Sequence, residues 1–116
     1  MKKKILIIGT VGALFFTSCS APKKLLYSWE NYDSTSYTYL KKGDEKSAEN
    51  LIKSYQQIIK KQDGTRKTVP PGIYADYGFI LLQTGKIEEG KEMLKKEISL
   101  YPESEIFIDR ILKMFD

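Results

Sequence analysis

Few side chains in this 116-residue sequence could carry out acid–base or nucleophilic chemistry. It contains no histidine and one cysteine, which excludes His-based catalysis, Ser-His-Asp and Cys-His nucleophiles and the usual zinc sites. Glu88, Glu89, Glu92 and Glu97 could in principle form a paired-carboxylate site. Lysines lie three and four positions away on the same expected helix, so we expect a solvated, salt-paired face instead. The sequence predicts a non-enzyme with no catalytic residue, no cofactor and no metal.

The single cysteine, Cys19, stands where a covalent modification is expected. Three lysines at 2–4 and a mostly apolar stretch at 5–16 form a signal-peptide pattern, and the stretch is too short to span a bilayer. Phe16-Thr17-Ser18-Cys19 then resembles a bacterial lipobox. That resemblance implies removal of the leader 1–18 and attachment of a diacylglyceryl group to Cys19. The alternative is a free thiol, a poor choice in an oxidising compartment.

The residues after Cys19 bear on where the protein resides. Two acyl chains give stable attachment, since each buried methylene contributes about 0.8 kcal/mol. Ser20 and Ala21 lack the aspartate that resembles an inner-membrane retention signal, and no acidic stretch follows, as it does in some surface-exported lipoproteins. We therefore expect a bacterial outer-membrane lipoprotein facing the periplasm, with a lipidated tether at 19–28.

Net charge gives no support to nucleic-acid binding. Of nineteen basic residues three lie at 2–4, which leaves sixteen against fifteen acidic residues in the mature chain. A domain that binds nucleic acid usually carries a large basic excess.

Two helices are expected over 70–104, where the chain also matches the tetratricopeptide (TPR) pattern. The matching positions are Tyr74, Tyr77, Gly78, Leu81, Gly90, Leu94 and Pro102. We expect a helix at about 73–83, a turn at Thr84-Gly85, a second helix from Ile87 to Tyr101 and a final helix at 105–115 with Ser104 as its N-cap. The final helix, with Ile108, Ile111, Leu112 and Phe115 expected on one face, resembles the capping helix of a repeat array.

A degenerate first repeat is expected over 29–62. Apolar spacing favours a helix at 25–42, and Gly43-Asp44 predicts a turn and an N-cap before an amphipathic helix with its apolar stripe at 48–59. The linking segment 63–71 reads as a solvent-exposed loop, or as one whose Arg66 and Lys67 touch lipid headgroups or a partner. The predicted fold is all-α: a short TPR-like array of about two helix–turn–helix repeats plus a C-terminal capping helix, over 29–116.

First helices of TPR repeats commonly line a binding groove. In this register the candidate partner groove comprises Asp33, Tyr37 and Leu40 from the first repeat and Ala75, Phe79 and Leu82 from the second. The alternative is that these residues simply pack on the last helix.

Several blocks of the chain resemble a family of short bacterial lipoproteins classed as a domain of unknown function. They are the segment 69–78 (VPPGIYADYG), Gln83-x-Gly85, Lys96-Glu97, the segment 101–104 (YPES) and Phe107-x-Asp109-Arg110. The resemblance covers most of the mature chain. Members of this family have no assigned activity. Members tend to be encoded beside a lipoprotein similar to the curli secretion channel and a second small lipoprotein, which implies a shared envelope complex.

Three function hypotheses follow. The favoured one is a membrane-anchored, non-catalytic adaptor or assembly factor, which binds a protein partner such as a companion lipoprotein. The second is an envelope or cell-wall enzyme or small-ligand binder, against which the lack of histidine counts. The third is a structural lipoprotein without a specific partner.

Overall fold

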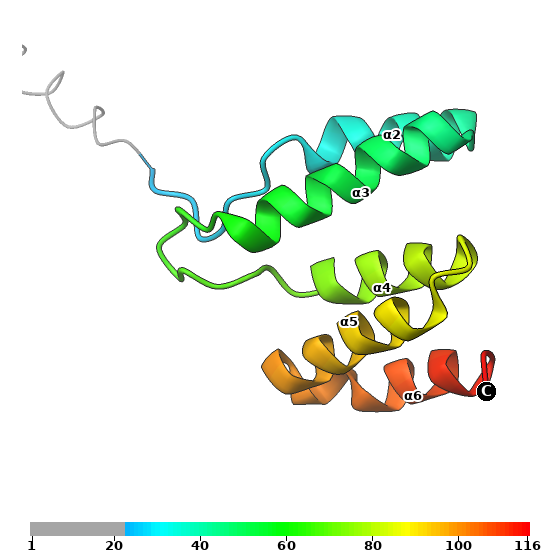
Figure 1. Ribbon diagram of the computed structural model, residues 1–116. Helices are drawn as coiled ribbons and strands as arrows, with labels where there is room; N and C mark the ends of the chain where they lie inside the picture. The colour runs from blue at the N-terminus through cyan, green and yellow to red at the C-terminus, as the bar shows by residue number, and fades with distance from the viewer. Residues whose placement is uncertain (1–22) are drawn as a thin grey trace, which may run out of the picture.

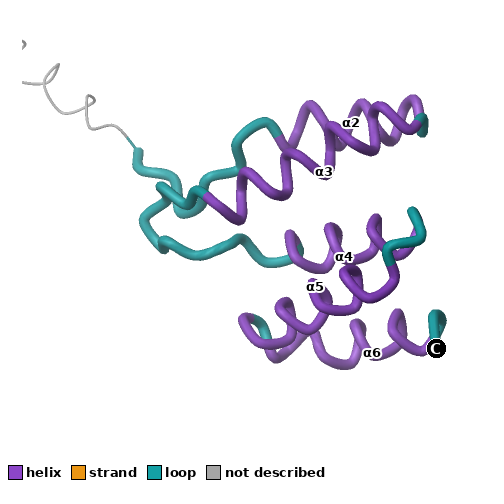
Figure 2. The backbone as a smooth tube through the Cα atoms, in the orientation of Figure 1, coloured by secondary structure: helices purple, strands orange, loops and turns teal. Residues whose placement is uncertain are grey.

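The computed structural model describes residues 23–116, where all regular structure is helical (Figures 1 and 2). The elements are α2 (Tyr32–Lys42), α3 (Glu45–Lys60), α4 (Ile73–Gln83), α5 (Ile87–Leu100), the short 3-10 helix η1 (Pro102–Ser104) and α6 (Glu105–Lys113). The predicted all-α fold is confirmed, and the arrangement is compatible with a TPR-like array. The predicted leader 1–18 and Cys19 lie outside the described residues. No helix within 23–116 is long and apolar enough to cross a membrane.

Two helical hairpins and a last helix are stacked in chain order (Figure 1). Gly43 closes the α2–α3 hairpin and Gly85 closes the α4–α5 hairpin, both with positive φ (61° and 87°), as the predicted turns require. Both turns lie at one end of the stack, and the chain enters from 23 at the other end, beside the segment that joins α3 to α4. Helix α6 packs against α5.

The core is built from apolar side chains of α3, α4, α5 and α6. One cluster joins α3 to α4 and contains Leu51, Tyr55, Ile58, Ile73, Tyr77, Ile80 and Leu81; the other joins α4, α5 and α6 through Leu82, Leu94 and Ile108. Full burial of one such side chain stabilises the fold by about 1.5–3 kcal/mol. The predicted apolar face of the last helix is confirmed, because Ile111, Leu112 and Phe115 pack against the second cluster.

The two predicted N-caps have different outcomes. The Asp44 carboxylate accepts the Ser47 N–H at 2.8 Å, so its predicted capping role is confirmed. Ser104 precedes α6, but its hydroxyl donates to the Tyr101 carbonyl oxygen at 2.7 Å and makes no cap. The η1 turn that begins at Pro102 brings that carbonyl within reach, which is why the cap prediction for Ser104 is wrong.

Residues 25–31 are not helical, although helix was predicted from Leu25. Residues 25–28 lie instead against 62–66, and we call this pair of segments the clasp. The Thr65 and Arg66 N–H groups donate to the Leu25 and Leu26 carbonyl oxygens at 3.0 and 3.1 Å. Pairing with a distant segment satisfies backbone groups that a helix would have satisfied locally. Helix α2 therefore begins only at Tyr32.

A side-chain pair completes the clasp. The Gln62 amide accepts from the Ser28 N–H at 3.2 Å and donates to the Ser28 carbonyl oxygen at 3.0 Å. A Cβ on Gly64 would collide with the backbone of Leu26 and Tyr27, so only glycine allows the two segments to approach this closely. The predicted exposed loop is correct for 65–67 and wrong for Gly64, Val69 and Pro70, which are buried.

Glu97 is buried, contrary to the predicted solvated acidic face. Its side chain is 2 % exposed, and its Oε1 accepts the Gly72 N–H at 2.7 Å just before α4 begins. The backbone N–H groups of Tyr74 and Ala75 also favour its charge, while burial raises its pKa above the ordinary value. Tyr101, one turn further along, donates its hydroxyl to the Val69 carbonyl oxygen at 2.6 Å. The end of α5 is thereby fixed to the Pro-Pro-Gly segment.

The other three glutamates of that helix follow the prediction. Glu88, Glu89 and Glu92 are exposed, and Glu92 pairs with Lys96 one turn later at 3.6 Å. An exposed pair of this kind contributes little to stability.

Candidate functional site

A groove lies along α2, α4 and α6, the helices that alternate in the chain with α3 and α5. It consists of two hollows, of about 390 Å³ between the first hairpin and α4 and about 280 Å³ between α4 and α6. Asp76 and Phe79 of α4 line both hollows, so the two hollows adjoin at these residues. We call it the α4 groove. Its other lining residues are Tyr32, Ser36, Tyr39, Leu40, Leu51, Tyr55, Ile80 and Gln83 on one side and Ala75, Phe107, Ile111 and Met114 on the other.

Large apolar side chains lie exposed in the α4 groove. Leu40 is 83 % exposed, Phe107 62 % and Met114 73 %, and Phe79 between them is partly exposed. Leu40 belongs to α2, Phe79 to α4 and Phe107 to α6, and Met114 directly follows α6. Exposed apolar side chains gathered on one face of a small domain make that face a candidate binding surface.

Asp76 supplies the one carboxylate that lines the groove. It accepts a hydrogen bond from the Tyr32 hydroxyl at 3.2 Å, which links α4 to α2. The packed groups around it raise the pKa of Asp76 above the ordinary value, although the side chain keeps access to solvent. The ion pairs within 23–116 do not include Asp76. The groove therefore offers an apolar floor with one negative charge at its centre.

The predicted groove residues are placed in three ways. Leu40, Ala75 and Phe79 line the α4 groove. Asp33 and Tyr37 are exposed on α2 but line neither of its hollows. Leu82 is a core residue, 2 % exposed, because it faces Leu94 and Ile108.

Sequence reasoning missed the α6 side of the groove. Phe107, Ile111 and Met114 stand at i, i+4 and i+7, the spacing of a helical stripe, so the signal was present. The prediction for α6 included only the apolar face that packs on α5. It overlooked the second apolar stripe of α6. Asp76 was missed because a lone carboxylate in a first helical turn is an ordinary favourable choice.

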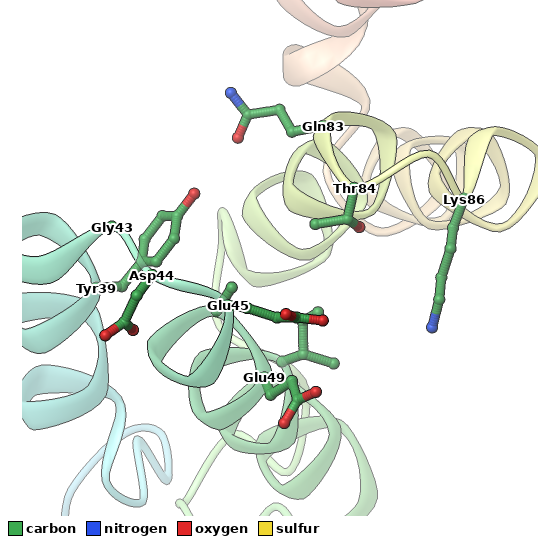
Figure 3. A pocket seen from close by; sticks show the side chains of 10 residues that line it. Tyr39, Gly43, Asp44, Glu45, Glu49, Gln83, Thr84 and Lys86 are labelled. Carbon is green, nitrogen blue, oxygen red and sulfur yellow. The ribbon is translucent and has the colours of Figure 1, made fainter.

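A separate hollow, outside the α4 groove, lies at the end of the stack where the two turns are (Figure 3). It has a volume of about 530 Å³, and its polar lining includes Asp44, Glu45 and Glu49 from α3 and its turn, with Lys86 across from them. Asp44 is committed to capping α3, and the Ser47 hydrogen bonds lower its pKa. No group of three or more His, Cys, Asp or Glu within 23–116 is placed to hold a metal ion. The lining of this hollow is more polar than that of the α4 groove.

Comparison with known proteins adds a family. No curated protein matches this chain, and neither does any solved structure. The model of one protein family does match, over residues 26–111, a range that begins in the clasp and ends within α6. Those residues include both hairpins and nearly all of the α4 groove. The chain therefore belongs to the family described as domain of unknown function DUF4810.

Proposed function

We propose that this protein is a lipid-anchored, non-catalytic helical-repeat adaptor that holds an extended segment of a partner protein in the α4 groove. The observation that supports it most is the run of exposed apolar side chains across α2, α4 and α6, from Leu40 through Phe79 to Phe107 and Met114. An extended chain crossing three helices would cover side chains that are otherwise in water.

The chemistry of the groove defines the partner segment. Apolar side chains would fill the two hollows beside Phe79, and a lysine, an arginine or a free amine would face Asp76 at the centre. A charge-assisted hydrogen bond to Asp76 would set the register of the segment. The companion lipoproteins that the family resemblance implies are the first candidates to supply it.

The proposed location follows from the sequence. Acylation of Cys19 would fix the mature chain to the outer membrane, facing the periplasm. The short segment between Cys19 and the clasp would keep the domain close to the bilayer. If labelled fatty acid were still incorporated into a Cys19→Ala variant, this part of the proposal would be wrong.

Site-specific photo-crosslinking tests the groove in intact cells. A photoreactive residue at Leu40 or Phe107 is expected to capture one protein, and mass spectrometry would identify the segment attached. The same residue at Leu100 or Ile106, which are exposed but line neither hollow, is the control. Equal capture at all four positions would contradict the proposal.

The captured segment then permits a direct measurement. A synthetic peptide of that segment should bind the purified protein, and replacing its basic residue with glutamate should weaken binding at least tenfold, since a charged hydrogen bond contributes about 1.5–3 kcal/mol. A peptide that binds equally well to the Phe79→Ala variant does not occupy the α4 groove.

A further inference from the structure

The end of the molecule at which the chain enters carries an unusual concentration of positive charge. Segments 23–28 and 60–67, which meet in the clasp, contain six basic residues and one acidic residue. The remaining described residues contain ten basic and fourteen acidic residues. The near-neutral composition of the mature chain therefore conceals two regions of opposite sign.

The basic side chains lie around one surface. Lys24 and Lys67 line the same hollow beside the clasp, and the Arg66 guanidinium lies over the Tyr27 ring at 5.9 Å. Lys61 contacts Asp63, the one acidic residue of the two segments, at 3.4 Å. Figure 1 shows both segments at the end where the chain enters, opposite the turns. Glu45, Glu49 and Lys86 line the hollow at those turns, so charges of both signs lie at that end.

Exposed leucines accompany these charges. Leu25 is 71 % exposed and Leu26 55 %, yet their carbonyl oxygens are held by the Thr65 and Arg66 N–H groups. The backbone of the two leucines is therefore fixed while their side chains remain in water. Fixed apolar side chains ringed by lysine and arginine are the composition of a surface that enters the headgroup region of a bilayer.

We infer that the clasp, together with the flanking residues Lys24 and Lys67, is a second membrane contact. Arg66, Lys67 and Lys24 bind anionic lipid headgroups there, while Leu25 and Leu26 enter the acyl boundary. The inference rests on the proposed anchor at Cys19 for its position and is independent of the α4 groove. Leu25 lies six positions after Cys19, a reach of roughly 20 Å when fully extended. Contact through the clasp would orient the domain, with the two turns directed away from the membrane.

The only tryptophan provides a native probe. Trp29 is partly exposed and lies 6.3 Å from Tyr27, measured between ring centroids, directly beside the clasp. The full chain, processed and acylated by the cells that produce it, would be reconstituted into vesicles that contain brominated lipid, which quenches tryptophan at the bilayer surface. One set of vesicles contains phosphatidylcholine alone and the other also contains phosphatidylglycerol.

Quenching of Trp29 should be clearly greater with phosphatidylglycerol and should fall as salt is added, because the Debye length shrinks from about 10 Å at 0.1 M to about 3 Å at 1 M. Arg66→Glu/Lys67→Glu should reduce quenching to the phosphatidylcholine level, since each basic residue near an anionic surface changes the docked population roughly fivefold. Lys41→Glu/Lys42→Glu, an exposed pair near the turns, is the matched control and should leave quenching unchanged.

Further measurements distinguish failure of the clasp inference from misfolding of a variant and from failure of the anchor. Leu25→Ser/Leu26→Ser should also reduce quenching, and the salt dependence needs no variant at all. Flotation with vesicles reports the anchor separately. A protein that floats with both vesicles but shows equal Trp29 quenching overturns the clasp inference alone. A protein that floats with neither overturns the anchor and the clasp inference together.

Discussion

Gly78 of α4 and Gly90 of α5 lie in direct backbone contact. A Cβ on either glycine would lie 2.8 Å from the carbonyl oxygen of the other, and 2.9 or 2.8 Å from the Cγ of Leu94 or Leu82. Neither backbone can move away, because the leucine beside each contact is buried in the core. The two helices therefore meet at their closest where neither bears a side chain, which explains two glycines in helix interiors at a cost of roughly 0.5–1 kcal/mol each.

Substitution of Gly90 by alanine should lower the free energy of unfolding by about 1–3 kcal/mol, the usual cost of overpacking. The improved helix propensity of alanine, about 1 kcal/mol, offsets part of this cost. Glu89→Ala, at the neighbouring exposed position, is the control and should have little effect. Urea denaturation provides the measurement. A Gly90→Ala protein as stable as the wild type would show that the helices can separate without loss.

Removal of the Glu97 carboxylate should destabilise the protein. Glu97→Ala leaves the Gly72 N–H without its acceptor, which costs about 1–3 kcal/mol for a buried group. Glu97→Gln keeps an oxygen that can accept this hydrogen bond and should be much milder. Thermal melting of the two variants separates the loss of the acceptor from the loss of charge.

The pH dependence of Glu97 has a definite sign. Burial, with a smaller contribution from the Asp76 carboxylate, raises its pKa in the folded protein above the ordinary 4.5. The folded state therefore keeps its proton to higher pH, and the stability this gives is complete below pH 4.5 and is lost as the pH rises through the raised pKa. The wild type should lose stability relative to Glu97→Gln over that range. The opposite slope would mean that the backbone N–H groups outweigh burial.

Phe79 and Leu82 should behave oppositely although they lie one turn apart on α4. Phe79→Ala should abolish partner capture with only a small change in melting temperature, because the ring is partly exposed in the α4 groove. Leu82→Ala should cost about 2–5 kcal/mol as a buried leucine and should act on capture only through unfolding. Crosslinking yield and thermal melting of the same preparations distinguish these effects. A large fall in melting temperature for Phe79→Ala would mark it as core.

Partner affinity should fall in mild acid. The raised pKa of Asp76 means that its carboxylate is protonated at a higher pH than an ordinary aspartate, whose pKa is 3.8. Protonation removes the charge that faces the basic group of the partner, so affinity should decrease as the pH falls through the raised pKa. Asp76→Asn should bind roughly tenfold more weakly at neutral pH, because a charged hydrogen bond is lost. If its affinity still fell with pH, another group would be responsible.

The clasp should open when Gly64 acquires a side chain. In Gly64→Ala the new Cβ would collide with the backbone of Leu26 and Tyr27, so the hydrogen bonds of Thr65 and Arg66 should break. Hydrogen exchange of those two amides should become much faster, while amides of α5 should stay protected. Exchange that is equally fast throughout would mean that the clasp is required for global folding.

The regular parts of this fold could be predicted from local patterns. Both ends of helix α4, Ile73 and Gln83, agree with the prediction. The Asp44 cap and the Gly85 turn were predicted as well, because each depends on neighbouring residues. The clasp could not be predicted, since it pairs Leu25 and Leu26 with residues forty positions away. Apolar spacing alone favoured helix there.

The candidate site was predictable only in part. Leu40, Ala75 and Phe79 were placed by repeat register, whereas Leu82 was misplaced by one helix face because register does not fix how far α6 covers α4. Glu97 resembled its exposed neighbours in sequence. Only the fold shows that its position on α5 lies beside the start of α4.

The α4 groove crosses the junction between the two hairpins. α3 and α4 meet there through a core cluster that includes Tyr55 and Tyr77, whose ring centroids lie 5.7 Å apart. The segment between α3 and α4, which supplies one half of the clasp, is the covalent link between the hairpins. In a stack of repeats each unit contacts only its neighbours, so a change of angle between two units takes place at their junction. Rotation at the junction between the hairpins would widen or narrow the hollow beside Leu40. A force on the clasp would therefore change the width of the α4 groove.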